Sequence, residues 1–153
     1  MATIEKFEDL EIWQLARTIN KEIYFEILRN LSLEDSAIRN QMDRSSGSIM
    51  DNIAEGFERN GTRELIQFLA IAKGSAGEVK SQLYRLVDRK KITEEQMNRF
   101  MYDINIILNK IGSFMNYLNK VNHKGLKFLK EPEVEYYPTR NHKPQTRNKI
   151  RLG

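Results

Sequence analysis

The sequence predicts an all-α protein, an up-down-up-down antiparallel four-helix bundle with an extended basic C-terminal tail. Four amphipathic segments of about 20 to 30 residues follow one another with short connections, which is the pattern typical of helix bundles. Proline disrupts helix interiors, and all three prolines come after residue 130. We therefore expect two parts, a bundle over residues 1–124 and a Pro-containing tail over residues 125–153.

The composition is that of one globular domain. With 153 residues, the chain is long enough to bury a substantial core. It contains no cysteine, which excludes a disulfide framework and a thiolate metal site. The N-terminus has no signal-peptide pattern, and no apolar run approaches the roughly 20 residues that span a bilayer. We therefore expect a cytoplasmic protein without a membrane partner.

The first amphipathic segment runs from about residue 9 to residue 29, with Trp13 beside its apolar stripe. That stripe consists of Ile12, Ala16, Ile19, Ile23 and Ile27. The second segment runs from about residue 33 to residue 59, and Ser32 is its expected N-cap. Its apolar stripe consists of Ile38, Met42, Ile49 and Ile53. A turn at Asn60-Gly61 should follow, in which Gly61 takes a positive φ.

The third segment is expected to begin with Thr62 as its N-cap and to end at the basic run 89–91. Its stripe consists of Leu65, Phe68, Leu69, Ala72, Ala76, Val79, Leu83 and Val87. The fourth segment begins with a capping box over residues 93–96, and Lys124-Gly125 is expected to end it. Its stripe consists of Met97, Met101, Ile104, Leu108, Ile111, Met115 and Leu118.

A stripe of small and polar residues lies beside the apolar stripe of the second segment, although serine and glycine are poor helix formers. Two interpretations stay open. These side chains can hydrogen-bond across the bundle and fix the helix register, since buried polar groups need partners, or they can contact a ligand. The stripe consists of Gln41, Ser45, Ser48, Asn52 and Gly56.

The outer faces of the second and third segments are also small or amphipathic rather than charged. Glycine inside a helix costs about 1 kcal/mol relative to alanine, which makes sense if a second surface packs there. We therefore predict an interface between subunits on these two helices; alternatively, small residues are merely tolerated on an outer face. The predicted interface residues are Gly47, Met50, Ala54, Phe57, Ile66, Ala70, Gly74, Gly77 and Tyr84.

The chain offers no recognisable set of catalytic, metal-binding or cofactor-binding residues. Both histidines, His123 and His142, lie outside the four segments, and no segment carries the Glu-x-x-His pairs of a di-iron bundle. No phosphate-binding loop motif is present either. We therefore expect a protein that is not an enzyme and that needs no metal or cofactor.

Positive charge is concentrated in the tail. The formal net charge is +4, and residues 123–153 carry eight Lys and Arg residues against three Glu residues. Such cations can neutralise phosphates, so we predict that the tail binds RNA or DNA. Alternatively, the tail packs on a neighbouring subunit or is only solvated, or the nucleic-acid site lies on the bundle around Arg85, Arg89, Lys90 and Lys91. The predicted nucleic-acid-binding residues are Lys124, Lys127, Lys130, Arg140, Lys143, Arg147, Lys149 and Arg151.

Three stretches resemble a known family: "FEDLEIWQLA", "NQMDRSSGSIMDNIAEGFER" and "FLAIAKGSAGEVKSQL". They are similar to bacterial four-helix-bundle proteins, some of which are encoded in intervening sequences of 23S rRNA genes. The resemblance covers roughly residues 7–120, and its most specific part is the stretch 48–56. That family is similar in fold to the accessory variability proteins of diversity-generating retroelements.

The resemblance implies a homo-oligomer, typically a pentameric ring or barrel, with a basic surface that can bind nucleic acid. In the retroelement branch it also implies a reverse transcriptase partner, and no catalytic activity is established for the family. We therefore predict a non-catalytic homo-oligomeric protein that binds nucleic acid or serves as an accessory scaffold for an RNA- or DNA-handling partner. The alternative is a structural interaction module whose tail clasps neighbouring subunits.

Overall fold

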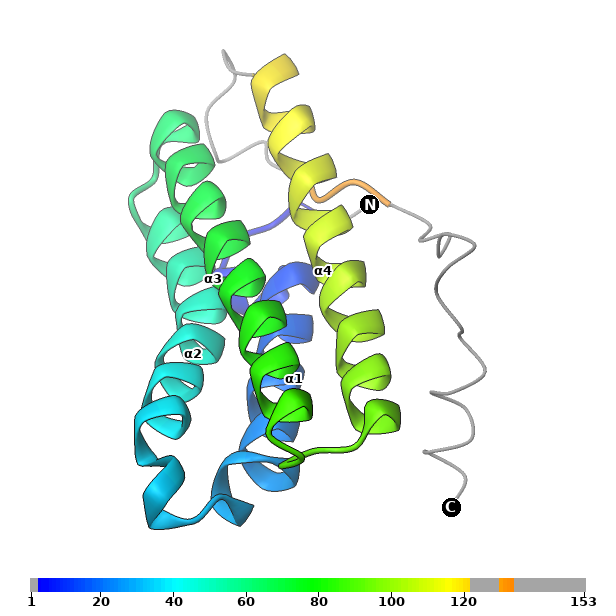
Figure 1. The fold of residues 1–153 in the computed structure, drawn as a ribbon. Coiled ribbons are helices and arrows are strands. Elements are labelled where there is room, and N and C mark those ends of the chain that lie inside the picture. Colours follow the sequence, from blue (N-terminus) through cyan, green and yellow to red (C-terminus); the bar gives the residue numbers. More distant parts are fainter. Residues whose placement is uncertain (1–2, 122–129, 134–153) are drawn as a thin grey trace.

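Four helices form an antiparallel bundle, as the sequence predicts (Figure 1). The computed structural model describes residues 3–121 and 130–133. Helices that are consecutive in the chain lie side by side and run in opposite directions. The helices are α1 (Glu11–Glu26), α2 (Ser36–Glu58), α3 (Thr62–Asp88) and α4 (Glu94–Lys120). Three short 3-10 turns accompany them: η1 (Phe7–Asp9), η2 (Leu28–Asn30) and η3 (Leu33–Asp35).

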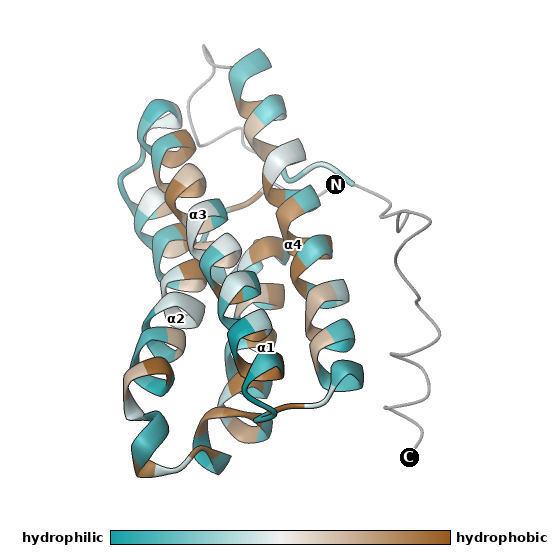
Figure 2. Ribbon diagram, in the orientation of Figure 1, coloured by the Kyte–Doolittle hydropathy of each residue, from teal (hydrophilic) through white to brown (hydrophobic). Residues whose placement is uncertain are grey.

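The apolar stripes of the four helices meet along the bundle axis, and hydrophilic residues cover much of the outer surface (Figure 2). All the predicted stripe residues of α1 and α2 are buried. In α4 the buried face is rotated from the predicted one, because large side chains at other positions fill the core. The additional buried residues are Phe100, Ile107 and Phe114, whereas Met97, Leu108 and Met115 are only partly buried.

The connection between α1 and α2 differs from the predicted N-cap. Ser32 precedes the 3-10 turn η3 rather than α2, and its side chain makes no capping hydrogen bond. Its hydroxyl donates a hydrogen bond to the Asp35 carboxylate at 3.0 Å, and Asp35 is the N-cap residue of α2. The same carboxylate lies 3.0 Å from Lys91 Nζ, which follows α3. The Asp35 carboxylate therefore binds both the Ser32 hydroxyl and the Lys91 ammonium group. These contacts join the α1–α2 connection to the α3–α4 connection at this end of the bundle.

The turn between α2 and α3 reverses the predicted roles of its two residues. Asn60 takes the positive φ of 56°, whereas Gly61 is extended with φ −127°. Asparagine tolerates the left-handed region better than most residues, so the turn does not need glycine there. Gly61 is consequently the N-cap of α3, and Thr62 is the first residue of the helix rather than its cap.

The start of α4 confirms the predicted capping box. Thr93 Oγ1 accepts a hydrogen bond from the Gln96 backbone N–H at 3.1 Å, and Gln96 Oε1 accepts one from the Thr93 N–H at 2.9 Å. The helix ends at Lys120. The predicted end at Lys124-Gly125 lies outside the described residues.

The stripe of small and polar residues on α2 packs against α3. Ser45 Oγ donates to Gln82 Oε1 at 2.7 Å, and Ser48 Oγ lies 2.9 Å from Ser75 Oγ. At Gly56 the helices are so close that an added Cβ would lie 2.6 Å from the Phe68 Cβ. Of the two interpretations of this stripe, hydrogen bonding across the bundle is therefore the one found at Ser45 and Ser48.

The segment 130–133 returns to the N-terminus of α1. The Glu131 carboxylate accepts hydrogen bonds from the backbone N–H groups of Glu11 and Ile12, the latter at 3.1 Å. These N–H groups have no partner within the helix, so Glu131 caps α1 from a distant part of the chain. Burial raises the pKa of Glu131 and Glu11 adds to this, while the two N–H donors and Lys110 oppose it.

Candidate nucleic-acid interface

The outer face of α1 combines aromatic and cationic side chains. At 100° per residue, positions four apart lie within 40° of one another, so they form a row along the helix. The row begins at the half-buried Trp13 and continues with the exposed Arg17, Lys21 and Phe25. Arg29, in η2 directly after α1, is also exposed and extends the row by one more position.

Two cations of this row lie over aromatic rings. Arg17 Cζ is 5.7 Å from the centroid of the Trp13 ring, and Arg29 Cζ is 5.0 Å from that of Phe25. A guanidinium over a ring is attracted by the π electrons, so these contacts hold both charges against the surface. Tyr24 meets Phe25 edge to face, and these two side chains remain 50% and 46% exposed. The face therefore presents fixed positive charge together with open aromatic surface.

The carboxylates at the two ends of α1 form ion pairs on a different flank of the helix, the one that faces α4. Glu11 pairs with Lys110 at 3.0 Å, and Glu26 pairs with the buried Arg99. These ion pairs neutralise the acids where α1 meets α4, so they do not offset the cations of the outer face. The charge on α1 is thus divided between an acidic flank that is paired and a cationic face that is exposed.

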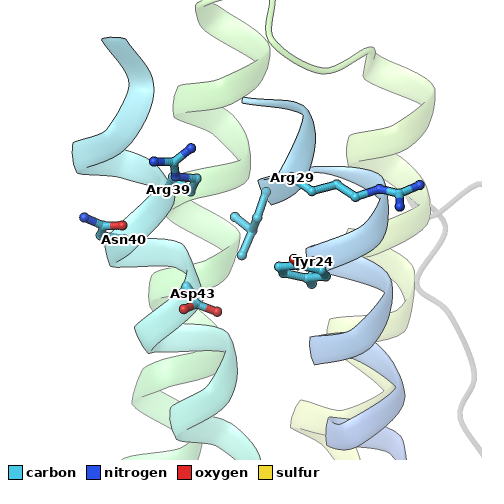
Figure 3. Close-up of a pocket in the computed structure, with 6 residues that line it drawn as sticks. Tyr24, Arg29, Arg39, Asn40 and Asp43 are labelled. Carbon is cyan, nitrogen blue, oxygen red and sulfur yellow. The ribbon is translucent and has the colours of Figure 1, made fainter. Parts of the chain in front are cut away.

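A pocket of about 280 Å³ lies beside this face, between the C-terminal end of α1 and the start of α2 (Figure 3). In Figure 3, Tyr24 and Arg29 come from the α1 side, while Arg39, Asn40 and Asp43 come from α2. Leu28 is buried and also lines the pocket.

The polar side chains of the pocket differ in how they are engaged. Arg29 Nε donates to the Phe25 carbonyl at 3.0 Å, and Arg39 Nη1 donates to the Leu31 carbonyl at 3.4 Å. Each guanidinium has five N–H donors, so most of its donors remain available. Among the described residues, the Asp43 side chain has no hydrogen-bond or ion-pair partner.

Lys130 is the one predicted nucleic-acid-binding residue within the described part of the chain. Lys130 is exposed, next to the residue that caps α1. The other seven predicted cations lie outside the described residues, as do His123 and His142. The binding role of the tail therefore stays a prediction.

The alternative basic cluster lies at the bundle end that joins α3 to α4. Arg85 donates a hydrogen bond to α2 at 3.0 Å, and Lys91 pairs with Asp35 and with Glu34. Lys91 holds the pKa of Asp35 below its usual value, and these carboxylates raise the pKa of Lys91. Half of this cluster is thus engaged by other side chains of the same chain. Arg89, Lys90 and Lys91 are all exposed, and within the described part of the chain the Arg89 and Lys90 side chains form no ion pair or hydrogen bond.

The predicted interface residues of α2 lie on the flank nearest to α1. Gly47, Met50 and Ala54 are partly buried, and a Cβ on Gly47 would lie 3.8 Å from the Asn20 side chain. Phe57 is only 9% exposed and belongs to the core, so its expected place on an outer face is wrong. The reason is that η1, which precedes α1, packs against α2 and covers the end of that helix.

The predicted interface residues of α3 are more open. Ile66 is partly buried, whereas Ala70, Gly74 and Gly77 are exposed and Tyr84 is 55% exposed. A Cβ on Gly74 or Gly77 would meet nothing within 4 Å. The packing of a single chain therefore gives no reason for glycine at these two positions. Their role in an interface stays a prediction.

Sequence reasoning did not single out the row on α1 as a site. A signal was present, because Trp13 and Arg17, and again Phe25 and Arg29, are four residues apart and face each other on a helix. Such pairs are common on solvated helices, so the spacing alone does not indicate a ligand. The pocket could not be found in this way, since it depends on how η2 turns away from α1.

Two features that point to other kinds of function are absent from residues 3–121 and 130–133. None of the helices described there is both long and apolar enough to cross a membrane. Within the same residues, no group of three or more His, Asp or Glu side chains is arranged to hold a metal ion.

Comparison with known proteins identifies a family. The model of the 23S rRNA-intervening sequence protein family matches residues 8–113, which span α1, α2, α3 and most of α4. No curated protein matches the chain. The matched range includes the α1 row and all the residues that line the neighbouring pocket.

Proposed function

The chain belongs to the 23S rRNA-intervening sequence protein family, and from this premise we propose that it is a homo-oligomeric, non-catalytic scaffold that binds nucleic acid. The observation that carries the proposal is the cationic and aromatic face of α1. Cations bind phosphates, and exposed aromatic rings stack on unpaired bases, so the combination favours a single strand with little sequence preference. The basic tail adds further cations to the same chain.

Assembly of several copies would strengthen such contacts. Gly74 and Gly77 leave room on α3 for a close helix from another copy, and the family resemblance favours a ring of five subunits. Identical faces gathered on one assembly bind a long strand by avidity, even when each contact is weak. An assembly of this kind can present RNA or DNA to a partner enzyme, such as a reverse transcriptase.

One observation favours the alternative, a purely structural interaction module. Glu131 shows that the chain after α4 can be fixed to the end of a helix by a carboxylate rather than by cations. A tail that clasps a neighbouring subunit in a similar way would need no nucleic acid. The two functions differ in one measurable property, the binding of nucleic acid at low salt.

The proposal is tested by fluorescence anisotropy of a labelled single-stranded oligonucleotide at increasing salt concentration. The full chain should bind at low salt, and its affinity should fall steeply as salt rises. The variant Arg17→Gln/Lys21→Gln/Arg29→Gln should bind more weakly. It should also reduce the slope of log affinity against log salt by about 2, at roughly 0.7 per phosphate contact on a single strand.

A matched variant controls for the loss of net charge. Arg63→Gln/Lys73→Gln/Lys120→Gln removes the same charge from exposed positions of α3 and α4, so its slope should stay that of the unmodified protein. Equal effects of the two variants would place the site elsewhere, with the tail and the end at Arg89 and Lys90 as the next candidates. No binding at low salt would favour the structural module.

A further inference from the structure

We propose that the pocket between α1, η2 and α2 binds one unpaired guanine of a single-stranded nucleic acid; this rests on the function proposed above. The pocket opens beside the α1 row, so a strand bound along that row passes its mouth. Its volume of about 280 Å³ is just below the range of about 300–1,000 Å³ that is typical of sites for drug-sized ligands. A single purine base is smaller than such ligands and fits.

The walls of the pocket suit a flat aromatic ring. Tyr24 offers a ring that is half exposed, and Leu28 provides a buried apolar surface. Bases that proteins read from single strands are splayed out, stacked on an aromatic side chain and hydrogen-bonded on their edges. Tyr24 can supply the stacking surface.

The Asp43 carboxylate, which lies across the pocket from the Tyr24 ring, determines which base the pocket prefers. Figure 3 shows the Asp43 carboxylate on the α2 side of the pocket and Tyr24 on the α1 side. No described residue hydrogen-bonds to this carboxylate or pairs with it, so both oxygens are free to accept. A carboxylate accepts two parallel N–H donors in a bidentate arrangement. Guanine presents two adjacent donors on its Watson–Crick edge, the ring N1–H and the exocyclic amine, whereas thymine and uracil present only one.

The two arginines of the pocket offset the charge of the carboxylate. Arg29 and Arg39 both line the pocket, and each keeps free N–H donors. In Figure 3 the Arg29 side chain points away from Asp43, and its guanidinium lies over Phe25. It can therefore bind a phosphate of the strand on the α1 row, while Arg39 binds one on the α2 side. With one carboxylate and two guanidinium groups, the pocket remains net positive. A negatively charged strand is therefore not repelled by Asp43.

The test measures the affinity of the full chain for two labelled oligo(dT) strands of equal length, one of which carries a single central guanine. The unmodified protein should bind the guanine-containing strand about tenfold more tightly, as expected for one good bidentate base contact. Replacing that guanine by hypoxanthine, which lacks the exocyclic amine, should remove most of the preference.

Substitutions then assign the preference to the pocket. Asp43→Asn keeps the shape but leaves only one acceptor oxygen, so the preference for guanine should disappear while binding of oligo(dT) remains. Asp51→Asn, at an exposed position two turns further along α2, makes the same chemical change and should leave the preference intact. Tyr24→Leu should weaken binding of the guanine strand by about tenfold, whereas Tyr24→Phe, which keeps the ring, should not.

Three outcomes would overturn the inference. Equal affinity for both strands, or a preference that survives Asp43→Asn, would show that the pocket does not read guanine, while the proposed nucleic-acid binding would still stand. Absence of binding to either strand at low salt would refute the proposed function and this inference together.

Discussion

At the scale of single residues, the glycines of this bundle differ in whether the packing of the helices requires them. An added Cβ at Gly56 would lie 2.6 Å from the Phe68 Cβ and 3.4 Å from the Leu65 Cα, whereas at Gly77 it would meet nothing. The contact at Gly56 involves atoms at or next to the backbone of α3, so a larger residue must push the two helices apart. Gly56 is therefore needed by the fold, and Gly77 is not.

This contrast gives a prediction for stability. Gly56→Ala should lower the free energy of unfolding by about 1–3 kcal/mol through overpacking. Gly77→Ala should raise it by up to about 1 kcal/mol in an isolated subunit, because alanine is the better helix former. Urea denaturation of both variants measures the difference. Similar effects of the two substitutions would contradict the close contact at Gly56.

A second residue-scale prediction concerns Glu131 and pH. Burial raises its pKa above the usual value, so the folded chain binds this proton more tightly than the unfolded chain does. Between the usual pKa near 4.5 and the raised one, stability should therefore fall as pH rises. Below that window the effect of Glu131 on stability is constant, and above it the loss is complete.

The variant Glu131→Gln isolates this effect, because its side chain does not titrate. The free energy of unfolding of the unmodified protein, minus that of the variant, should decrease as pH rises through this window. Urea denaturation at a series of pH values measures it. A difference that increases with pH, or that does not change, would refute the assignment of the raised pKa to Glu131.

At the scale of the elements, the seam between α2 and α3 depends on buried polar contacts. Ser45 donates to Gln82, and both side chains are almost fully buried. Removal of one partner leaves the other without its hydrogen bond, whereas replacement of both by apolar groups can be nearly neutral. This hydrogen bond fixes the register of α2 against α3 along the bundle axis.

The seam can be tested by a pair of substitutions. Ser45→Ala should destabilise the protein by about 1–3 kcal/mol, and Ser45→Ala/Gln82→Leu should cost less than the single change. Ser81→Ala, on the exposed side of α3, is the control and should have almost no effect. Thermal or urea denaturation gives the three values. A double variant that is less stable than Ser45→Ala would contradict the account.

The four helices could be predicted from the sequence because each repeats its apolar residues at helical spacing. The predicted helix cap and turn were wrong where two residues or two hydrogen-bond partners can serve the same local purpose. Ser32 has the right side chain for an N-cap but bonds to Asp35, and Asn60 takes the positive φ that glycine was expected to take. In α4, Phe100 and Phe114 shift the buried face away from Met97 and Met115, since the largest apolar side chains fill the centre of the core.

The candidate site could be predicted only in part. Cations and aromatics at four-residue spacing are visible in the sequence of α1, but their exposure depends on which flank meets α4. The pocket needs Tyr24 and Asp43 on one side of the bundle, and these residues are brought together only by the turn through η2 and η3. The cap on α1 by Glu131 joins residues 120 positions apart, for which the sequence carries no local signal.

At the scale of the whole molecule, the proposed function requires that identical subunits assemble and present their α1 faces to a single strand. The open glycines of α3 favour a close contact with another copy, and a bulky side chain would block it. Gly74→Leu should therefore dissociate the assembly while leaving the helix content unchanged, as measured by light scattering and circular dichroism. Leucine is also a better helix former than glycine, so loss of helix would not be expected from this change.

The most direct test of the proposed function is the molar mass of the protein mixed with a single-stranded oligonucleotide, measured by light scattering after size-exclusion chromatography at low salt. We expect a protein mass that is a multiple of the 18.0 kDa chain, with the oligonucleotide eluting in the same peak. A peak of 18.0 kDa that elutes apart from the oligonucleotide would contradict both the assembly and the binding of nucleic acid.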